Sequence, residues 1–287
     1  PLYANYIGFA HLLGVRVVPI PTSPETGYRL PARPIWEERL SSRTRAILVC
    51  NPGNPTGTVY RRDELEMVLG LAADWGLFIL ADEVYREFCF DGETHHSLFT
   101  LAGSTERVVL LDSISKRFSA CGARIGSLGT TNPDLYRACL HFAQARLSPP
   151  SLGQIMATRA YRLPASYYDD LVREYRDRRD AVLDSLRAIE GVHCETPRGA
   201  FYAMIKLPVD DADRFAAWML SDFDHGGETT FVAPGNGFYA TPGAGAQEVR
   251  LAYVLGAGHM RKAVEILGHG LAAYPGRVAA ARSTTIS

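Results

Sequence analysis

Three short apolar runs in the first half of the chain predict strands that are buried on both faces. They cover residues 46–50, 77–81 and 107–111, and each is continuous rather than alternating. Continuous runs of this length are typical of parallel strands covered by helices. Between the first two runs, apolar residues recur at helical spacing over 62–75, and Gly76 is a typical helix end. This alternation of strand and helix predicts an α/β sheet.

The second half of the chain has a different pattern, which predicts a smaller α+β unit. A long amphipathic helix begins near Pro164, with apolar residues on one face and Arg and Asp on the other. A strand, a helix, a strand and a last helix are then expected, in that order, at 199–207, 212–223, 249–255 and 259–273.

These patterns divide the chain into four parts. We expect a large domain, an interdomain helix, a small C-terminal domain and a frayed tail of small and polar residues, at 1–163, 164–190, 191–276 and 277–287 respectively.

Composition and charge are those of an ordinary globular protein. The 287 residues suffice for about two domains, and 47% of them are apolar and 21% charged. A net charge of -1 gives no electrostatic reason to expect nucleic acid or an anionic membrane as a partner. No apolar run approaches the ~18 residues that span a bilayer. We therefore expect neither partner for this chain.

The cysteines and histidines predict no disulfide framework and no metal site. The five cysteines are scattered, and none forms a C-x-x-C pair. His95 and His96 are adjacent, and neighbouring side chains on an extended chain point in opposite directions. We expect reduced thiols in a cytoplasmic protein.

Polar groups follow the predicted strands of the first half, as a site at strand ends requires. Singly, each has an ordinary interpretation: a lysine after a strand is usually a solvated surface residue, and Asn-Pro and Pro-Gly are common turn pairs. The groups are Asn51-Pro52-Gly53-Asn54-Pro55-Thr56-Gly57 after the first run, Asp82 and Tyr85 after the second, and Ser113, Lys116 and Arg124 after the third.

Together, a lysine, an acid, a phenol, an amide, a hydroxyl and a guanidinium are what pyridoxal 5'-phosphate (PLP) needs from a protein. The set resembles, in order and spacing, the core of fold-type I PLP enzymes of the aminotransferase class I/II family, which are aspartate aminotransferase-like. The string 51–57 is much rarer than its parts, and the resemblance extends from Pro1 to about Pro275. It implies a large α/β domain with a mainly parallel sheet, a smaller α+β C-terminal domain and a homodimer.

The resemblance implies a role for five residues around the cofactor ring. Lys116 would hold the aldehyde as a Schiff base and move a proton between Cα and C4'. Asp82 would face the pyridine nitrogen, and Tyr85 and Asn54 would reach O3', with a cis Asn54-Pro55 bond. Tyr3 aligns with the aromatic residue that stacks on the ring, whereas its neighbour Tyr6 is compatible with a plain core position.

Three further residues match phosphate and substrate ligands of the family. Ser113 and Arg124 have the spacing from Lys116 of the serine and arginine that bind the PLP phosphate. Arg250 matches the arginine that binds the substrate α-carboxylate, with Asn54 beside it. The resemblance fails at the N-terminal end, because no segment of this chain matches the Gly/Ser-rich phosphate-binding loop of the family. We therefore expect a large domain that is incomplete at its N-terminus and a chain with impaired PLP binding.

Three functions stay open. The leading hypothesis is transfer of an amino group between an amino acid, with aspartate as the first guess, and a 2-oxo acid. A PLP-dependent β-C-S lyase would use the same residues and differ in pocket shape. An aminotransferase-like effector domain of a transcriptional regulator would follow a basic helix-turn-helix segment upstream of Pro1, although the intact Arg250 favours an enzyme.

Overall fold

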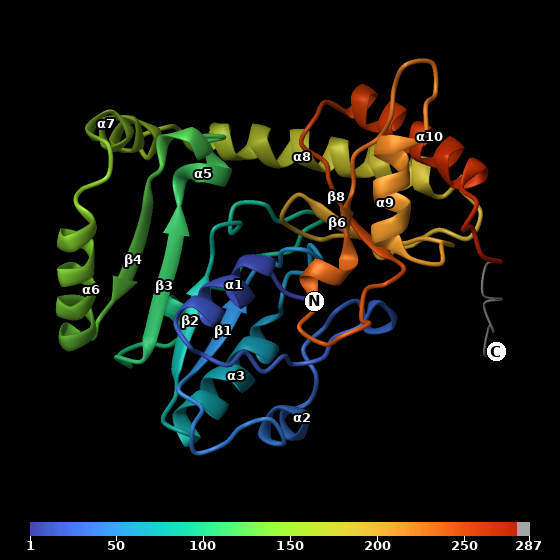
Figure 1. The fold of residues 1–287 in the computed structure, drawn as a ribbon. Coiled ribbons are helices and arrows are strands. Elements are labelled where there is room, and N and C mark those ends of the chain that lie inside the picture. Colours follow the sequence, from blue (N-terminus) through green and yellow to red (C-terminus); the bar gives the residue numbers. More distant parts are fainter. Residues whose placement is uncertain (280–287) are drawn as a thin grey trace.

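The structure is a computed structural model and describes residues 1–279. Two units of different size lie side by side, and one long helix, α8, runs from one to the other (Figure 1). The larger unit is built on a sheet with the strand order β1-β2-β3-β4. Its strands are β1 (Ala46–Cys50), β2 (Phe78–Asp82), β3 (Val108–Ser113) and β4 (Gly126–Thr130).

The first three strands are parallel, and β4 pairs antiparallel to β3. This confirms the predicted fold class, an α/β unit with a mainly parallel sheet. The three predicted strands end within two residues of their observed ends. The fourth strand was not predicted, because its sequence Gly-Ser-Leu-Gly-Thr has neither an apolar run nor clear alternation.

Helices surround this sheet. They are α1 (Ala4–Leu12), α2 (Arg33–Glu37), α3 (Arg62–Asp74), α4 (Leu98–Leu101), α5 (Ile114–Arg117), α6 (Pro133–Arg146) and α7 (Ser151–Ala160), with short 3-10 helices η1 (Pro24–Thr26) and η2 (Cys121–Ala123). Local sequence explains where α3 begins and ends. The Glu64 carboxylate accepts a hydrogen bond from the Arg61 amide, and Gly76 adopts the left-handed conformation that the sequence predicts.

The smaller unit is a four-stranded antiparallel sheet packed against helices. Its strand order is β5-β6-β8-β7, and α8 packs along α10 over it. The elements are α8 (Ala165–Leu186), β5 (His193–Cys194), β6 (Tyr202–Lys206), α9 (Ala212–Ser221), β7 (Ala233–Pro234), η3 (Gly235–Phe238), β8 (Glu248–Ala252) and α10 (Ala257–Ala273). The helices and strands predicted for this half are all present.

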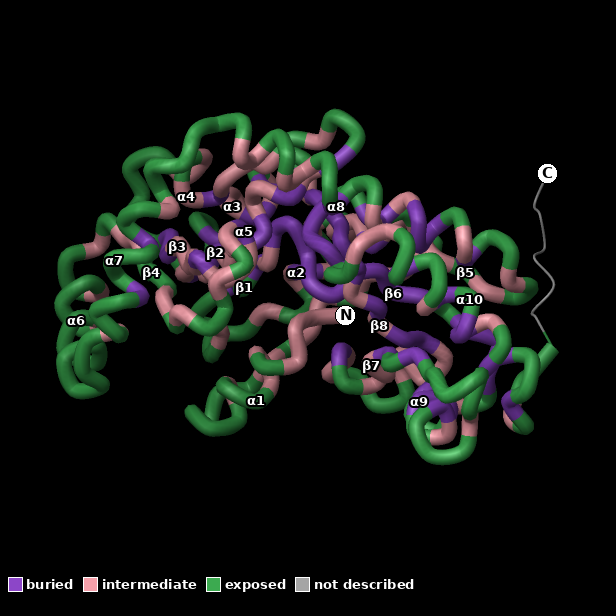
Figure 2. The backbone as a smooth tube through the Cα atoms, turned by 90° about the horizontal axis from the view of Figure 1, so that it is seen from above, coloured by how far each residue is buried: buried purple, intermediate pink, exposed green. Residues whose placement is uncertain are grey.

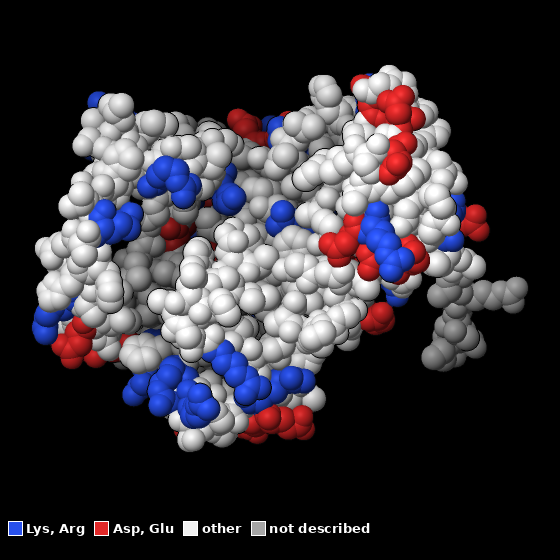
Figure 3. Space-filling model, viewed as in Figure 1, with Lys and Arg blue, Asp and Glu red and all other residues white. Residues whose placement is uncertain are grey.

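Buried residues concentrate along the strands and where the two units meet, whereas α1 and α6 bury none of their residues (Figure 2). On the face drawn in Figure 3, basic side chains gather over the α2–α3 region beside acidic ones, and uncharged residues cover most of the remainder. No helix within residues 1–279 is long and apolar enough to cross a membrane.

The domain boundaries given above remain predictions. Of the segment 277–287, predicted to be frayed, the structure describes 277–279, where the Val278 amide donates to the Pro208 carbonyl at 2.9 Å. Residues 280–287 lie outside the described part of the chain.

Gly57, the last residue of the string 51–57, joins the two units through its backbone. Its carbonyl accepts hydrogen bonds from the amides of Arg198 (2.9 Å) and Gly199 (2.7 Å), just before β6. Its φ is +70°, and a Cβ at this position would lie 2.4 Å from Pro197 Cβ and 2.8 Å from the Gly199 carbonyl oxygen. Only glycine fits this contact without a shift of backbone.

We predict that Gly57→Ala lowers the free energy of unfolding by about 2–4 kcal/mol, because it adds both a steric clash and left-handed strain. The matched control is Gly70→Ala inside α3, where a Cβ would meet nothing within 4 Å. That change should raise stability by roughly 0.5–1 kcal/mol. Urea denaturation followed by circular dichroism measures both, and equal effects would contradict the role of Gly57.

Candidate active site

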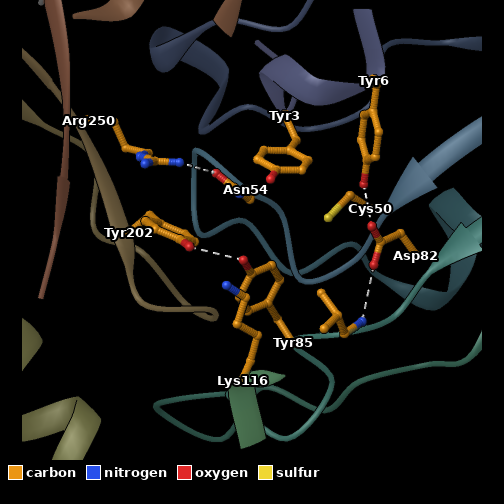
Figure 4. Close-up of a pocket in the computed structure, with 10 residues that line it drawn as sticks. Tyr3, Tyr6, Cys50, Asn54, Asp82, Tyr85, Lys116, Tyr202 and Arg250 are labelled. Atoms are coloured by element: carbon orange, nitrogen blue, oxygen red, sulfur yellow. Dashed lines mark hydrogen bonds between the residues drawn. The ribbon is translucent and has the colours of Figure 1, made fainter. Parts of the chain in front are cut away.

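A cavity of about 320 Å³ lies between the loops that follow the parallel strands and the smaller unit (Figure 4). This edge of an α/β sheet, at the carboxyl ends of its strands, is where ligands usually bind. The cavity is lined by Tyr3, Tyr6, Cys50, Asn54, Asp82, Val84, Tyr85, Lys116, Tyr202 and Arg250. Six of the eight predicted site residues are among them.

Asp82, the last residue of β2, is held in place by two hydrogen bonds. The Tyr6 hydroxyl donates to its Oδ2 at 2.5 Å, and the Val84 amide donates to its Oδ1 at 3.3 Å. Burial raises the pKa of Asp82, and both hydrogen bonds oppose that shift because they favour the carboxylate. Beside it lies Cys50, whose pKa burial raises to about 12, so this thiol stays protonated. The carboxylate of Asp82 is thus held in one orientation beside a neutral phenol and a neutral thiol.

Lys116 lies in α5, one turn after the end of β3, and its side chain enters the cavity beside Tyr85 (Figure 4). Its Nζ is 6.0 Å from the Tyr85 ring centroid and 5.9 Å from that of Phe201. Burial lowers the pKa of Lys116, and the positive charges of Arg250 and Arg124 act in the same direction, although Cys121 and Asp82 oppose them. A lowered pKa increases the neutral fraction of the amine, which is its nucleophilic form.

The chain has only three lysines, which makes the position of Lys116 more informative. Lys206 ends β6 and is exposed, and Lys262 pairs with Glu228 at 2.6 Å on the surface of α10. Lys116 is the one whose amine enters the cavity.

Arg250, on β8, brings a cation into the cavity from the smaller unit. Its guanidinium packs against the rings of Tyr202 and Phe238, whose centroids lie 4.4 Å and 4.6 Å away. One terminal nitrogen donates to Asn54 Oδ1 at 3.0 Å. Its Nε is buried and has no hydrogen-bond partner among the described residues. Unpaired buried donors are rare and costly, so this edge of the guanidinium is suited to an anionic ligand such as a carboxylate.

The hydrogen bond from Arg250 also orients Asn54. Because the amide oxygen of Asn54 accepts from Arg250, its NH₂ group is left to donate elsewhere. The cis Asn54-Pro55 bond that the resemblance implies is confirmed, and Asn51-Pro52 is cis as well.

The two predicted phosphate ligands do not line the cavity. Ser113 Oγ lies 2.9 Å from the Ile125 carbonyl and 2.8 Å from Ser115 Oγ. Arg124 donates to the Cys121 carbonyl at 2.8 Å. Their roles toward phosphate remain predictions.

Sequence reasoning missed four of the lining residues. The sequence is compatible with a plain core position for Tyr6, yet its hydroxyl donates to Asp82. Cys50 could have been found from the parallel register, which pairs it with Asp82. Nothing in the sequence marks Tyr202, because its contact with Tyr85 spans 117 residues. The fourth is Val84, which contributes its amide hydrogen bond to Asp82.

A buried polar network lies behind the cavity and centres on Glu83, which is 2% exposed. Its carboxylate accepts from Ser97 Oγ and the Leu98 amide, each at 2.9 Å, and lies 3.0 Å from His95 Nε2. The other ring nitrogen of His95 is 3.5 Å from the Asn51 side chain. The network therefore links the loops after β1 and β2. Within residues 1–279, no group of three or more His, Cys, Asp and Glu side chains is placed to hold a metal.

Comparison with known proteins identifies the family. The family model "Aminotransferase class I and II" matches residues 1–267. The chain belongs to this family. Its members of the aspartate aminotransferase type use PLP as cofactor.

Among curated relatives, the chain is 33% identical to the putative aminotransferase YugH of Bacillus subtilis, over 83% of this chain and 60% of that protein. It is 32% identical to the arginine–pyruvate transaminase AruH of Pseudomonas aeruginosa, over 92% of this chain and 65% of that protein. The chain thus spans less than two thirds of the length of either relative.

Among solved structures, aspartate aminotransferase from Thermus thermophilus with maleate matches with a TM-score of 0.80 and 27% identity, over 94% of this chain and 68% of that one. Aromatic aminotransferase from Pyrococcus horikoshii matches with a TM-score of 0.84 and 26% identity, over 95% and 71% respectively.

We predict that Glu83→Ala lowers the free energy of unfolding by about 3 kcal/mol, because it leaves several buried donors without their acceptor. The matched control is Glu66→Ala on α3, whose partner Arg62 is exposed and whose loss should cost less than about 0.5 kcal/mol. Urea denaturation measures the difference. Equal stabilities of the two variants would show that the network does not hold the loops.

Proposed function

We propose that this chain is the catalytic core of a PLP-dependent aminotransferase, which moves an amino group between an amino acid and a 2-oxo acid. The observation that carries the proposal is the convergence of Lys116, Asp82, Tyr85, Asn54 and Arg250 on one cavity. Membership of the aminotransferase class I and II family supports it.

The donor set of the cavity fits the cofactor. Lys116 offers an amine with a lowered pKa for an aldehyde, and Asp82 offers a fixed carboxylate for a pyridine nitrogen. Asn54 and Tyr85 offer donors for a phenolate oxygen, and Tyr3 offers an aromatic face. When bound, PLP supplies a conjugated ring that withdraws electrons from the bonds to the substrate Cα.

The residues of the chain then have distinct tasks. Arg250 binds the substrate α-carboxylate through its unpaired Nε edge and so places Cα near Lys116. With the cofactor bound, the Nζ of Lys116 would accept the proton of the substrate Cα and donate it back. Asp82, as a carboxylate, would hold the pyridine nitrogen of the cofactor and favour its protonated form.

Four further assignments belong to the proposal. Ser113 and Arg124 bind the phosphate, since Ser113 directly precedes α5, which carries Lys116, and Arg124 directly follows η2. The protein is a homodimer, and the exposed apolar side chains of α1, α6 and α7 support this, among them Phe9, Phe142 and Leu152. It works with reduced cysteines in the cytoplasm. Aspartate is the first amino donor to test, because several relatives are named aspartate aminotransferases.

The test is a transamination assay with PLP, aspartate and 2-oxoglutarate, followed by a panel of other amino acids. We expect Lys116→Ala to lower kcat by about 10³-fold or more and Arg250→Leu to lower kcat/KM by about 10²-fold. The matched controls, Lys262→Ala and Arg62→Leu, change exposed residues of the same types and should retain activity.

Full activity of Lys116→Ala would contradict the proposal. Pyruvate and ammonia formed from a cysteine conjugate without any 2-oxo acid would replace it with the β-lyase alternative.

A further inference from the structure

Tyr202 connects the two halves of the candidate site. It is the first residue of β6, is 6% exposed and lines the cavity. Its hydroxyl oxygen is 3.0 Å from the hydroxyl oxygen of Tyr85, and its ring lies against the guanidinium of Arg250 (Figure 4). One side chain therefore touches both the group that faces Lys116 and the group that faces the substrate carboxylate.

We propose that Tyr202 is a positioning residue with two separable roles. Its ring fixes the plane of the Arg250 guanidinium, and its hydroxyl orients the phenol of Tyr85. This inference rests on the proposed function and adds to it a residue that acts through two others.

The role of the ring follows from how Arg250 is enclosed. The rings of Tyr202 and Phe238 both lie against the guanidinium, with centroids 4.4 Å and 4.6 Å from its carbon, and one terminal nitrogen donates to Asn54. Two ring contacts restrict how a planar cation can tilt, and the hydrogen bond to Asn54 restricts its rotation within the plane. The remaining edge is thus presented in one direction before a carboxylate arrives, which reduces the entropy lost on binding.

The role of the hydroxyl follows from the number of protons that the two phenols have available to donate. Burial raises the pKa of both Tyr202 and Tyr85, so both stay protonated at neutral pH. Two hydroxyl groups in contact share one hydrogen bond, which leaves one proton free. When Tyr85 faces a negatively charged oxygen, it donates to that oxygen and accepts from Tyr202. A donor that is itself hydrogen-bonded binds an anion more strongly.

This arrangement has a measurable consequence for the cofactor bound to Lys116. A hydrogen-bond donor to the phenolate oxygen favours the form of the bound cofactor that has lost its proton. Losing the hydrogen bond from Tyr202 to Tyr85 therefore raises the pH at which the bound cofactor titrates. The other titratable groups around the two phenols are Lys116, Asp82, Cys50, Tyr3, Tyr6 and Arg250. Tyr202→Phe leaves all of them in place, so a shift reports the hydroxyl alone.

The experiment uses the PLP-loaded protein and two readouts that do not depend on turnover. The first is the pH titration of the near-visible absorbance band. The second is the dissociation constant of maleate, a dicarboxylate without an amino group, with acetate as a second probe. Three variants separate the roles: Tyr202→Phe, Tyr202→Leu and Phe238→Leu.

We expect Tyr202→Phe to raise the titration midpoint by about 0.3–1 pH unit, with maleate binding changed less than about twofold. Tyr202→Leu should raise the midpoint equally and weaken maleate binding by about 5- to 30-fold, because the ring is lost as well. Phe238→Leu should weaken maleate binding without moving the midpoint.

Each unexpected result overturns a different part of the inference. An unchanged midpoint in Tyr202→Phe overturns the role of the hydroxyl, and unchanged maleate binding in Tyr202→Leu overturns the role of the ring. Wild-type protein that binds neither maleate nor acetate overturns the assignment of Arg250, and with it the role of the ring. Absence of the absorbance band both in this chain and in any longer natural protein that contains it overturns the proposed function together with this inference. Thermal unfolding of each variant without PLP checks that it folds, and Tyr202→Phe keeps the packed ring in any case.

Discussion

The parallel pairing of β1, β2 and β3 determines where the groups that follow these strands can lie in the candidate site. The register sets Cys50 beside Asp82 at the end of neighbouring strands. The next strand, β3, ends at the same edge and delivers Lys116 one turn later. The strand pairing thus brings a carboxylate and an amine to the same edge of the sheet, and the network around Glu83 then fixes the loops that follow the strands.

The second half of the site depends on how the smaller unit meets these loops. The backbone contact at Gly57 and the hydrogen bond from Arg250 to Asn54 both connect the string 51–57 to that unit. The first contact requires a residue without a side chain, and the second leaves one edge of a buried cation unpaired. Stability and ligand binding therefore both depend on this one short loop.

Much of this could be predicted from the sequence because its signals are local. The apolar runs of β1, β2 and β3, the helix end at Gly76 and the string 51–57 all lie within short windows. The contacts of Tyr6 with Asp82 and of Tyr202 with Tyr85 could not be predicted, because they join residues 76 and 117 positions apart. The antiparallel β4 was missed because its glycines carry no strand signal. Ser113 and Arg124 match the family spacing, but their polar groups bond locally in this structure, so spacing alone does not place them in the cavity.

The most direct test of the account is to find which lysine binds PLP. The protein is incubated with PLP, reduced with borohydride and digested, and the labelled peptide is identified by mass spectrometry. Only three lysines compete, so the result has few interpretations. We predict an absorbance band in the near-visible range and label on the peptide that contains Lys116, both lost in Lys116→Ala and retained in Lys206→Ala and Lys262→Ala. Label on Lys206 or Lys262, or a band that persists in Lys116→Ala, would contradict the account. So would the absence of any band both in this chain and in any longer natural protein that contains it.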